Sequence, residues 1–426
     1  MVYSILEVEN MRKECLNNNW RRLDNIAKVF SLHSKNNTNI FRYSVILKHN
    51  VNKIILKRAL KITLNQFKAF KVKFAVSFCW NYLQLNTKEL IVEEEDGRFC
   101  ERIDLKKNND YLFKVTYYKN KINLDVFHVL TDGTGAIKFL ESIVSNYLSL
   151  KYNISIDNNK KDYEINYEDQ YLKNSDKTLK IDSKPKIAAR IPGEINKNIN
   201  NTNHYIINIK ELKEVCKKYN VTITEYLTGI YIYSIYLSIY KKKLDKEIII
   251  EIPINLRRYY NVDTLSNFFV CMSVNPKILE KNFTTFNQIL NQVHQEFKEK
   301  TTLDKVKSYL TRDVKIGKNI FINLIPLFIK KFFINLLSII MSKSTTSFIS
   351  NVGMINIEDK YKKYIDNVYV LVMPGKIHKI KCTICSFNNN LNVTINSNID
   401  DIELQKTFFK LIKKEINNIK VESNNK

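Results

Sequence analysis

The chain has 426 residues, of which 44% are hydrophobic and 12% aromatic, and it carries a net charge of +25. This much apolar material can form a packed core and excludes a generally disordered chain. The basic surplus, 68 Lys and Arg against 43 Asp and Glu, favours anionic partners. Nucleic acid is disfavoured, because the basic residues form no continuous stripe and no zinc finger or aromatic RNA-binding signature is present.

The cysteines and the first residues bear on the cellular compartment. The seven cysteines are scattered and odd in number, and residues 1–14 contain no apolar core segment. These features predict a reducing, cytoplasmic setting and no cleaved signal peptide.

In the first half of the chain, apolar residues alternate between helical spacing and strand spacing. The two arms of 111–129 alternate and meet at 119–121, which predicts a β-hairpin whose second arm puts Ile122, Leu124, Val126 and His128 on one face. The other predicted elements are a helix at 20–30, a strand at 41–47, a helix at 53–67, strand character at 71–83 and a helix at 136–148.

A polar, aperiodic stretch from 153 to about 203 predicts a crossover between two halves. We therefore expect an N-terminal half over 1–155, a linker over 156–202 and a C-terminal half over 203–426. In the second half, the same spacing rules predict strands at 204–209, 247–256, 268–274, 345–353, 367–374, 380–387 and 391–397, and helices at 210–220, 224–240, 285–297 and 402–420.

One segment, 320–341, is apolar enough to require comparison with a membrane span. Lys330 and Lys331 stand in its middle and Pro326 interrupts it, and two lysines at the centre of a bilayer would cost several kcal/mol. We predict a buried or interfacial helix pair, with peripheral contact at a membrane surface as the alternative.

Several kinds of site are excluded or disfavoured. The eight glycines form neither of the common nucleotide-binding loops, and there is no G-x-S-x-G. Cys382 and Cys385 have the spacing of metal ligands but no second pair, so we interpret them as core residues and predict no metal site. The histidines treated as ordinary surface or core residues are His33, His49, His204, His294 and His378.

His128 differs from these, because it ends a strand and is followed by a tight turn. Asp132 or Thr131 can cap the next helix, and Gly133 and Gly135 leave room for a close approach. A histidine of near-neutral pKa beside small residues suits general-base chemistry. The competing interpretation, a core histidine next to a helix cap, is equally compatible with this spacing.

The stretch HVLTDG, residues 128–133, resembles the H-x-x-x-D-G motif of acyltransferases with the chloramphenicol-acetyltransferase fold. Residues 20–30 with 41–47 resemble the opening of bacterial alcohol-acetyltransferase-like proteins. Residues 254–269 resemble the Arg…Asn segment of the second half, and SFISNVG (347–353) resembles a serine-asparagine-glycine strand of the group. The D-F-G-W-G motif of the plant subgroup is missing, and Phe127-His128 replaces the doubled histidine of wax ester synthases.

The resemblance implies a mixed α/β fold of two similar halves, each a mixed sheet flanked by helices, with an active-site tunnel between them. It also implies transfer of an acyl group, expected to be acetyl, from coenzyme A to an alcohol, amine or lipid acceptor. Acyl-CoA would be a co-substrate, with no permanently bound cofactor. The alternatives are a condensation-type enzyme with carrier-bound donors and a non-catalytic, membrane-associated binding protein. The acceptor, the acyl length and the oligomeric state stay open.

Roles for individual residues follow from the same resemblance. His128 would be the general base. Asp132 would turn away from the tunnel and pair with Arg257, so that these two residues and Gly133 support the catalytic loop. Asn267, Ser350 and Asn351 would supply donors to an oxyanion or to the tunnel.

Overall fold

The computed structural model describes residues 20–31, 38–76, 78, 81–97, 100–155, 162–163, 168–176, 186–196, 200–240, 246–278, 284–318 and 325–424. Its strands are β1 (Trp20–Arg22), β2 (Ile40–Leu47), β3 (Val72–Val76), β4 (Asn81–Leu85), β5 (Val92–Glu94), β6 (Phe113–Tyr118), β7 (Lys121–Phe127), β8 (Asn201–Asn208), β9 (Ile250–Asn255), β10 (Phe269–Val274), β11 (Ser347–Met354), β12 (Ile365–Val372), β13 (Ile380–Phe387), β14 (Asn390–Ser397) and β15 (Ile419–Ser423).

The helices alternate with these strands along both halves of the chain. They are α2 (Asn25–Ser31), α3 (Lys53–Gln66), the 3₁₀ turn η1 (Lys68–Phe70), α4 (Gly133–Tyr152), α5 (Gln170–Asn174), α6 (Ile209–Lys218), α7 (Ile223–Tyr240), α8 (Arg257–Tyr260), α9 (Phe286–Lys300), α10 (Leu303–Lys318), α12 (Leu327–Ser342), α13 (Asp359–Lys362) and α14 (Glu403–Lys413).

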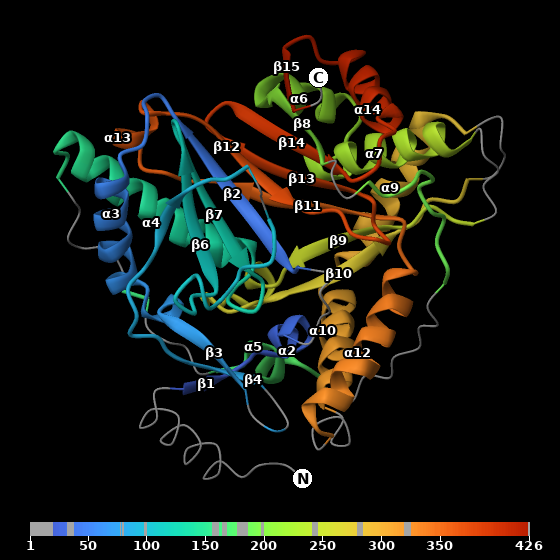
Figure 1. The fold of residues 1–426 in the computed structure, drawn as a ribbon. Coiled ribbons are helices and arrows are strands. Elements are labelled where there is room, and N and C mark those ends of the chain that lie inside the picture. Colours follow the sequence, from blue (N-terminus) through green and yellow to red (C-terminus); the bar gives the residue numbers. More distant parts are fainter. Residues whose placement is uncertain are drawn as a thin grey trace.

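The first half is built on a five-stranded sheet in the order β12-β2-β7-β6-β5. Helices α3 and α4 cover its outer face (Figure 1). The alternation that predicted the hairpin explains this packing, because Ile122, Leu124 and Val126 of β7 enter the core beneath α4. A small sheet, β1-β4-β3, lies beside this half.

The second half is built on a seven-stranded sheet in the order β10-β9-β11-β13-β14-β8-β15. Its strands are mixed, since β11 runs parallel to β9 and β13 while the other neighbours are antiparallel. Helices α7, α9 and α14 lie together over one face (Figure 1), and their apolar residues form a separate core with it. The expected mixed α/β architecture of two sheets flanked by helices is confirmed.

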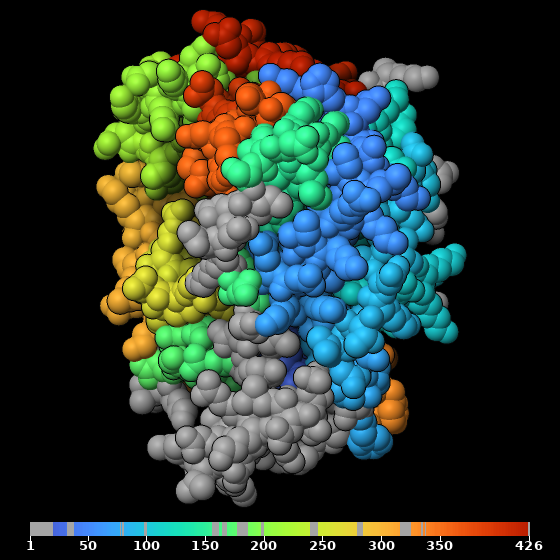
Figure 2. Space-filling model, turned by 90° about the vertical axis from the view of Figure 1, so that its left-hand side faces the viewer, coloured from blue at the N-terminus to red at the C-terminus, as the bar shows by residue number. Residues whose placement is uncertain are grey.

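The two halves of the sequence do not coincide with the two large sheets. Strand β12 comes from the second half, yet it pairs antiparallel with β2, with Val370 opposite Tyr43. It also touches the seven-stranded sheet, because Thr383 Oγ1 donates to the Val370 carbonyl at 2.6 Å and His204 stacks on Tyr369. On the surface, the blue and cyan residues of the first half lie beside the green, yellow and orange residues of the second (Figure 2).

Three predicted elements differ most from the structure. The helix expected at 20–30 begins only at Asn25, because residues 20–22 pair with β4 and Asp24 Oδ1 accepts from the Ala27 N–H at 2.7 Å. The strand region at 71–83 is split between β3 and β4. The helix expected over 402–420 ends at Lys413, and residues 419–423 add strand β15 to the edge of β8.

The apolar segment 320–341 is described from residue 325 onward, and its earlier residues lie outside the described part. Helix α12 begins directly after Pro326, as an interrupting proline predicts. Lys330 is buried, with 2% of its surface exposed, but much of the helix is not. Among the described residues, no helix is both long and apolar enough to cross a bilayer.

Candidate active site

His128 follows the last residue of β7, where the chain turns toward α4. Its N–H donates to the Asn39 carbonyl at 2.9 Å, which anchors the turn to the residues just before β2. The ring is half-buried and has Phe30, Phe41 and Phe269 around it, with ring centroids 4.4, 4.9 and 5.5 Å away. The imidazole therefore sits among aromatic side chains from both halves of the chain.

A polar side chain from the second half contacts the imidazole. Asn267, in the segment between α8 and β10, brings its amide Oδ1 to 3.0 Å from His128 Nδ1. Its Nδ2 donates to the His128 carbonyl at 3.1 Å and to Asp24 Oδ2 at 3.0 Å. A backbone carbonyl and an ionised carboxylate can both only accept a hydrogen bond, so the amide nitrogen faces these two oxygens and the amide oxygen faces the ring.

This orientation determines where the proton of the neutral imidazole lies. Because the amide oxygen accepts, His128 Nδ1 carries the hydrogen and Nε2 keeps a free lone pair. Burial lowers the pKa of His128, and the charge of Lys381 lowers it further, while Asp132 and the Asn267 hydrogen bond act in the opposite direction. The ring is therefore neutral near pH 7 and presents Nε2 as a base.

Asp132 has no contact with the imidazole nitrogens and instead caps α4. Its Oδ1 accepts from the N–H groups of Thr134 and Gly135, each at 3.1 Å. Its Oδ2 accepts from the Phe268 N–H at 2.9 Å and from Arg257 at 2.8 Å. Burial by itself would raise the pKa of Asp132, but the Arg257 charge and these hydrogen bonds hold it below its ordinary value.

Arg257 is buried, whereas its neighbour Arg258 is exposed. Beyond the ion pair with Asp132, its guanidinium donates to the carbonyls of Thr264 and Ser266 at 3.0 and 2.8 Å. The structure therefore gives Arg257 an internal position. It ties the turn after β7 to the segment that carries Asn267.

Glycine is required at position 135 by close packing. A Cβ added there would lie 2.0 Å from Thr131 Oγ1 and 2.7 Å from the Leu265 carbonyl. A Cβ on Gly133 would meet the Tyr43 hydroxyl at 3.1 Å and Val352 at 3.4 Å, so β11 passes close to the start of α4. The room that these glycines leave is therefore occupied by the protein's own backbone and side chains and not by a substrate.

Ser350 and Asn351 lie on opposite faces of β11. Ser350 is in register with Thr383 and lies on the face that carries Lys381, the residue whose charge acts on His128. Asn351 turns to the other face and donates to Thr224 Oγ1 of α7 at 3.0 Å. Asn351 is therefore not placed as a donor beside His128 is expected to be. Asn267 already uses both hydrogens of its amide, one toward Asp24 and one toward the His128 carbonyl.

Asp24, Phe30, Phe41 and Phe269 belong to the surroundings of His128 and were not singled out from the sequence. The stretch WRRLDN contains Asp24, but a lone aspartate before a helix is ordinarily read as a cap. Asp24 meets Asn267 only in the tertiary structure, where the next residue, Asn25, also donates from Nδ2 to the Asp313 carbonyl of α10 at 2.7 Å.

The remaining candidates lie away from His128. Cys382 and Cys385 are buried in the two cores. Among described residues, no three His, Cys, Asp or Glu side chains gather as metal ligands. His204 bonds to Thr394 and His378 to Thr345, whereas His294 has an acidic neighbour, Glu225, at 3.0 Å. His33 lies outside the described residues.

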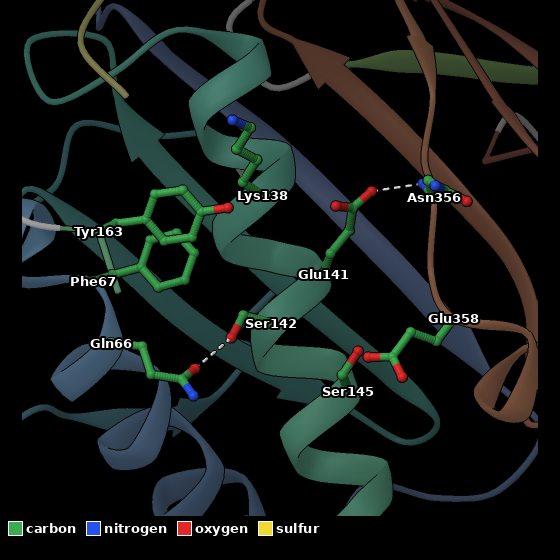
Figure 3. A pocket seen from close by; sticks show the side chains of 9 residues that line it. All are labelled: Gln66, Phe67, Lys138, Glu141, Ser142, Ser145, Tyr163, Asn356 and Glu358. Carbon is green, nitrogen blue, oxygen red and sulfur yellow. Dashed lines mark hydrogen bonds between the residues drawn. The ribbon is translucent and has the colours of Figure 1, made fainter. Parts of the chain in front are cut away.

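A shallow pocket of about 180 Å³ opens between the end of α3, one side of α4 and the segment after β11 (Figure 3). Two hydrogen bonds cross it, from Ser142 to Gln66 at 3.1 Å and from the Asn356 N–H to Glu141 at 2.6 Å. His128 does not line it. The tunnel that the resemblance implies at His128 therefore stays a prediction.

No protein-family model matches the chain, and no curated protein matches its sequence. Solved structures match its fold. TRI101 of F. sporotrichioides, complexed with coenzyme A and T-2, aligns with a TM-score of 0.63 at 10% identity, over 94% of this chain and 99% of that one. The trichothecene 15-O-acetyltransferase TRI3 of Fusarium sporotrichioides aligns with 0.60 at 10% identity, over 92% and 94%.

A third similar structure is the starter condensation domain of rhizomide synthetase, in complex with C8-CoA and Leu-SNAC. It aligns with a TM-score of 0.61 at 9% identity, over 94% of this chain and 95% of that chain. This chain has the chloramphenicol-acetyltransferase-like fold. At these identities the likeness extends to the fold alone. The chloramphenicol-acetyltransferase-like fold that HVLTDG and the three other stretches predicted is confirmed, and the chemistry has to be argued from the site.

Proposed function

We propose that the protein is an acyltransferase that moves an acyl group, acetyl in the simplest case, from coenzyme A to an alcohol or amine. The observation that carries this proposal is the contact between Asn267 Oδ1 and His128 Nδ1 at 3.0 Å, which leaves the lone pair of the neutral imidazole on Nε2. The similar fold of a 15-O-acetyltransferase and of two structures with coenzyme A or C8-CoA supports the choice of reaction and donor.

In the proposed reaction, His128 Nε2 takes the proton of the acceptor O–H or N–H as the acceptor atom attacks the thioester carbonyl. The tetrahedral intermediate then expels the thiolate as its C–S bond breaks, and Nε2 returns the proton to sulfur. The products are the ester or amide and free coenzyme A, and no covalent enzyme intermediate is needed. General-base help of this kind is worth about 10²–10⁴-fold, or roughly 3–5 kcal/mol of barrier.

The other residues would act by position. Asp132 and Arg257 hold the turn that aims His128, through an ion pair of 2.8 Å. Among the three oxyanion donors predicted from sequence, Ser350 has the most suitable place, because it shares a sheet face with Lys381. Lys381 adds a positive charge near the site, and burial lowers its pKa to about 8.

The test measures release of free thiol from acetyl-CoA with a panel of alcohols and amines. His128→Ala should lose about 10²–10⁴-fold in rate, while His49→Ala, at a histidine outside the site, should keep full activity. If the His128 variant and the parent release thiol equally fast, His128 is not the base. Activity with acyl-pantetheine on a carrier protein, but not with free acyl-CoA, would select the condensation-type alternative.

A second proposal concerns the surface of α12. Seven of its apolar side chains are between 43% and 72% exposed. They are Phe328, Phe332, Phe333, Leu336, Ile339, Ile340 and Met341. An exposed apolar surface of this kind commonly marks an interaction site. We propose that this face makes peripheral contact with a lipid surface, as the alternative interpretation of 320–341 predicted. The net charge of +25 would favour an anionic bilayer.

A further inference from the structure

Three separate parts of the chain meet in one line of hydrogen bonds, from Asp24 through Asn267 to His128. We propose that Asp24 is a positioning residue, whose charged carboxylate fixes the amide of Asn267 and thereby the proton on Nδ1 of His128. This inference rests on the proposed function, since it concerns the same base. It assigns a role to a residue that does not touch the imidazole.

Both oxygens of Asp24 are used as acceptors. Oδ1 accepts from the Ala27 N–H at 2.7 Å, and Oδ2 accepts from Asn267 Nδ2 at 3.0 Å. An ionised carboxylate can accept at both oxygens, whereas a protonated one must place a hydrogen on one of them. The backbone N–H of Ala27 cannot change its role, so the added proton belongs on the oxygen that faces Asn267.

A proton on that oxygen would reverse the direction of the hydrogen bonds from Asp24 to Asn267 and from Asn267 to His128. Asp24 then donates, Asn267 turns its amide oxygen toward Asp24, and the amide nitrogen faces His128 Nδ1. The ring then accepts a hydrogen bond at Nδ1 and carries its own hydrogen on Nε2, the atom that would otherwise take the proton of the acceptor substrate. The reversal gives up the hydrogen bond from Asn267 Nδ2 to the His128 carbonyl at 3.1 Å, so it requires that the carboxyl of Asp24 orients the amide more strongly than that carbonyl does. Protonation of Asp24 therefore removes the base without displacing the ring.

The surroundings of Asp24 place this titration near neutrality. Burial raises the pKa of Asp24 to about 7, and the charge of Asp169 adds to the shift, while the Ala27 and Asn267 hydrogen bonds and Arg21 oppose it. Tyr171, whose pKa is itself raised partly by Asp24, comes from the same segment as Asp169. Lys28 of α2 also interacts with Asp24, and α10, which packs against α2, carries the ion pair of Arg312 with Asp313.

The first test reads the tautomer directly and needs no substrate. Protein labelled with ¹⁵N in histidine is examined by NMR, and the His128 signals are those that disappear in His128→Ala. At pH 8 the parent should show a protonated Nδ1 and a free Nε2, and Asp24→Asn should shift His128 toward the other tautomer. An unchanged tautomer in Asp24→Asn would overturn the proposal, whatever the enzyme assay shows.

The second test uses the dependence of kcat/KM on pH. The parent should lose activity as pH falls through about 7, following Asp24. Asp24→Asn should be roughly 10²-fold less active at pH 8 and should lack this step. Asp169→Asn keeps an amide oxygen that can cap α5, and it should keep activity at pH 8 while moving the step to lower pH. If the step stays in place in both variants, Asp24 does not control it.

The two tests separate the two proposals. If His128→Ala retains activity, the general-base function fails, but the NMR result still decides whether Asp24 sets the tautomer. If His128 is essential and Asp24→Asn leaves both tautomer and pH profile unchanged, only the positioning role fails. Asp169→Asn is the matched control, because it removes a carboxylate charge near Asp24 from a residue outside the line of hydrogen bonds.

Discussion

The guanidinium of Arg257 donates two hydrogen bonds to the carboxylate of Asp132, at 2.8 and 3.1 Å, although the two residues are 125 positions apart. The same carboxylate caps α4 and accepts from the Phe268 N–H. Phe268 follows Asn267, so one buried ion pair holds both the turn that carries His128 and the residue that orients its ring.

Arg257→Ala should therefore destabilise the protein and reduce its activity together. Removing the cation leaves Asp132 buried without its charge partner, which costs about 3–5 kcal/mol. Denaturant unfolding measures the loss, and Arg258→Ala, at the exposed neighbouring arginine, is the matched control. Equal midpoints for the two variants would show that the ion pair contributes nothing to folding.

Gly135→Ala tests the close packing at the start of α4. The new methyl group would lie 2.0 Å from Thr131 Oγ1 and 2.7 Å from a backbone carbonyl that cannot move aside easily. Overpacking of this kind costs about 1–3 kcal/mol, seen as a lower midpoint of thermal unfolding. Gly375→Ala is the control, because an added Cβ there has nothing within 4 Å. A stable Gly135→Ala protein would mean that the turn can shift without cost.

Local patterns in the sequence were sufficient to predict β7, the turn and α4, because strand alternation, an Asp cap and helical spacing act within a few residues. They also singled out His128 and Asp132. The relation between Asp24 and Asn267 could not be predicted, since it joins residues that are 243 positions apart in the sequence. Strand β12 shows the same limit: its alternation predicts a strand, but nothing in NVYVLV says that it pairs with β2 and not within the second sheet.

Asp24→Asn should stabilise the fold while it lowers activity. The folded-state pKa of Asp24 is raised from 3.8 to about 7, so folding above pH 7 must bury a charge that the unfolded chain carries in water. This penalty is absent below pH 4, grows between 4 and 7 and is complete above 7. The variant should accordingly melt roughly 2 °C or more above the parent at pH 8, with no advantage at pH 4. A lower Tm at pH 8 would contradict a penalty from the buried carboxylate.

Contact of α12 with lipid predicts binding to vesicles that depends on two of its most exposed rings. Phe332 and Phe333 are 68% and 58% exposed, and replacing both with glutamate adds two negative charges to an apolar face. The parent should float with vesicles rich in phosphatidylserine and bind less to phosphatidylcholine alone, because an anionic surface attracts a basic protein. The double variant should remain unbound.

The control for this prediction is Ile54→Glu on α3, at an isoleucine in the other half that is 65% exposed. It also replaces an exposed apolar side chain by a negative charge, and it should still bind. Equal binding of the double variant and the parent would assign the attraction to net charge alone and remove α12 from the contact.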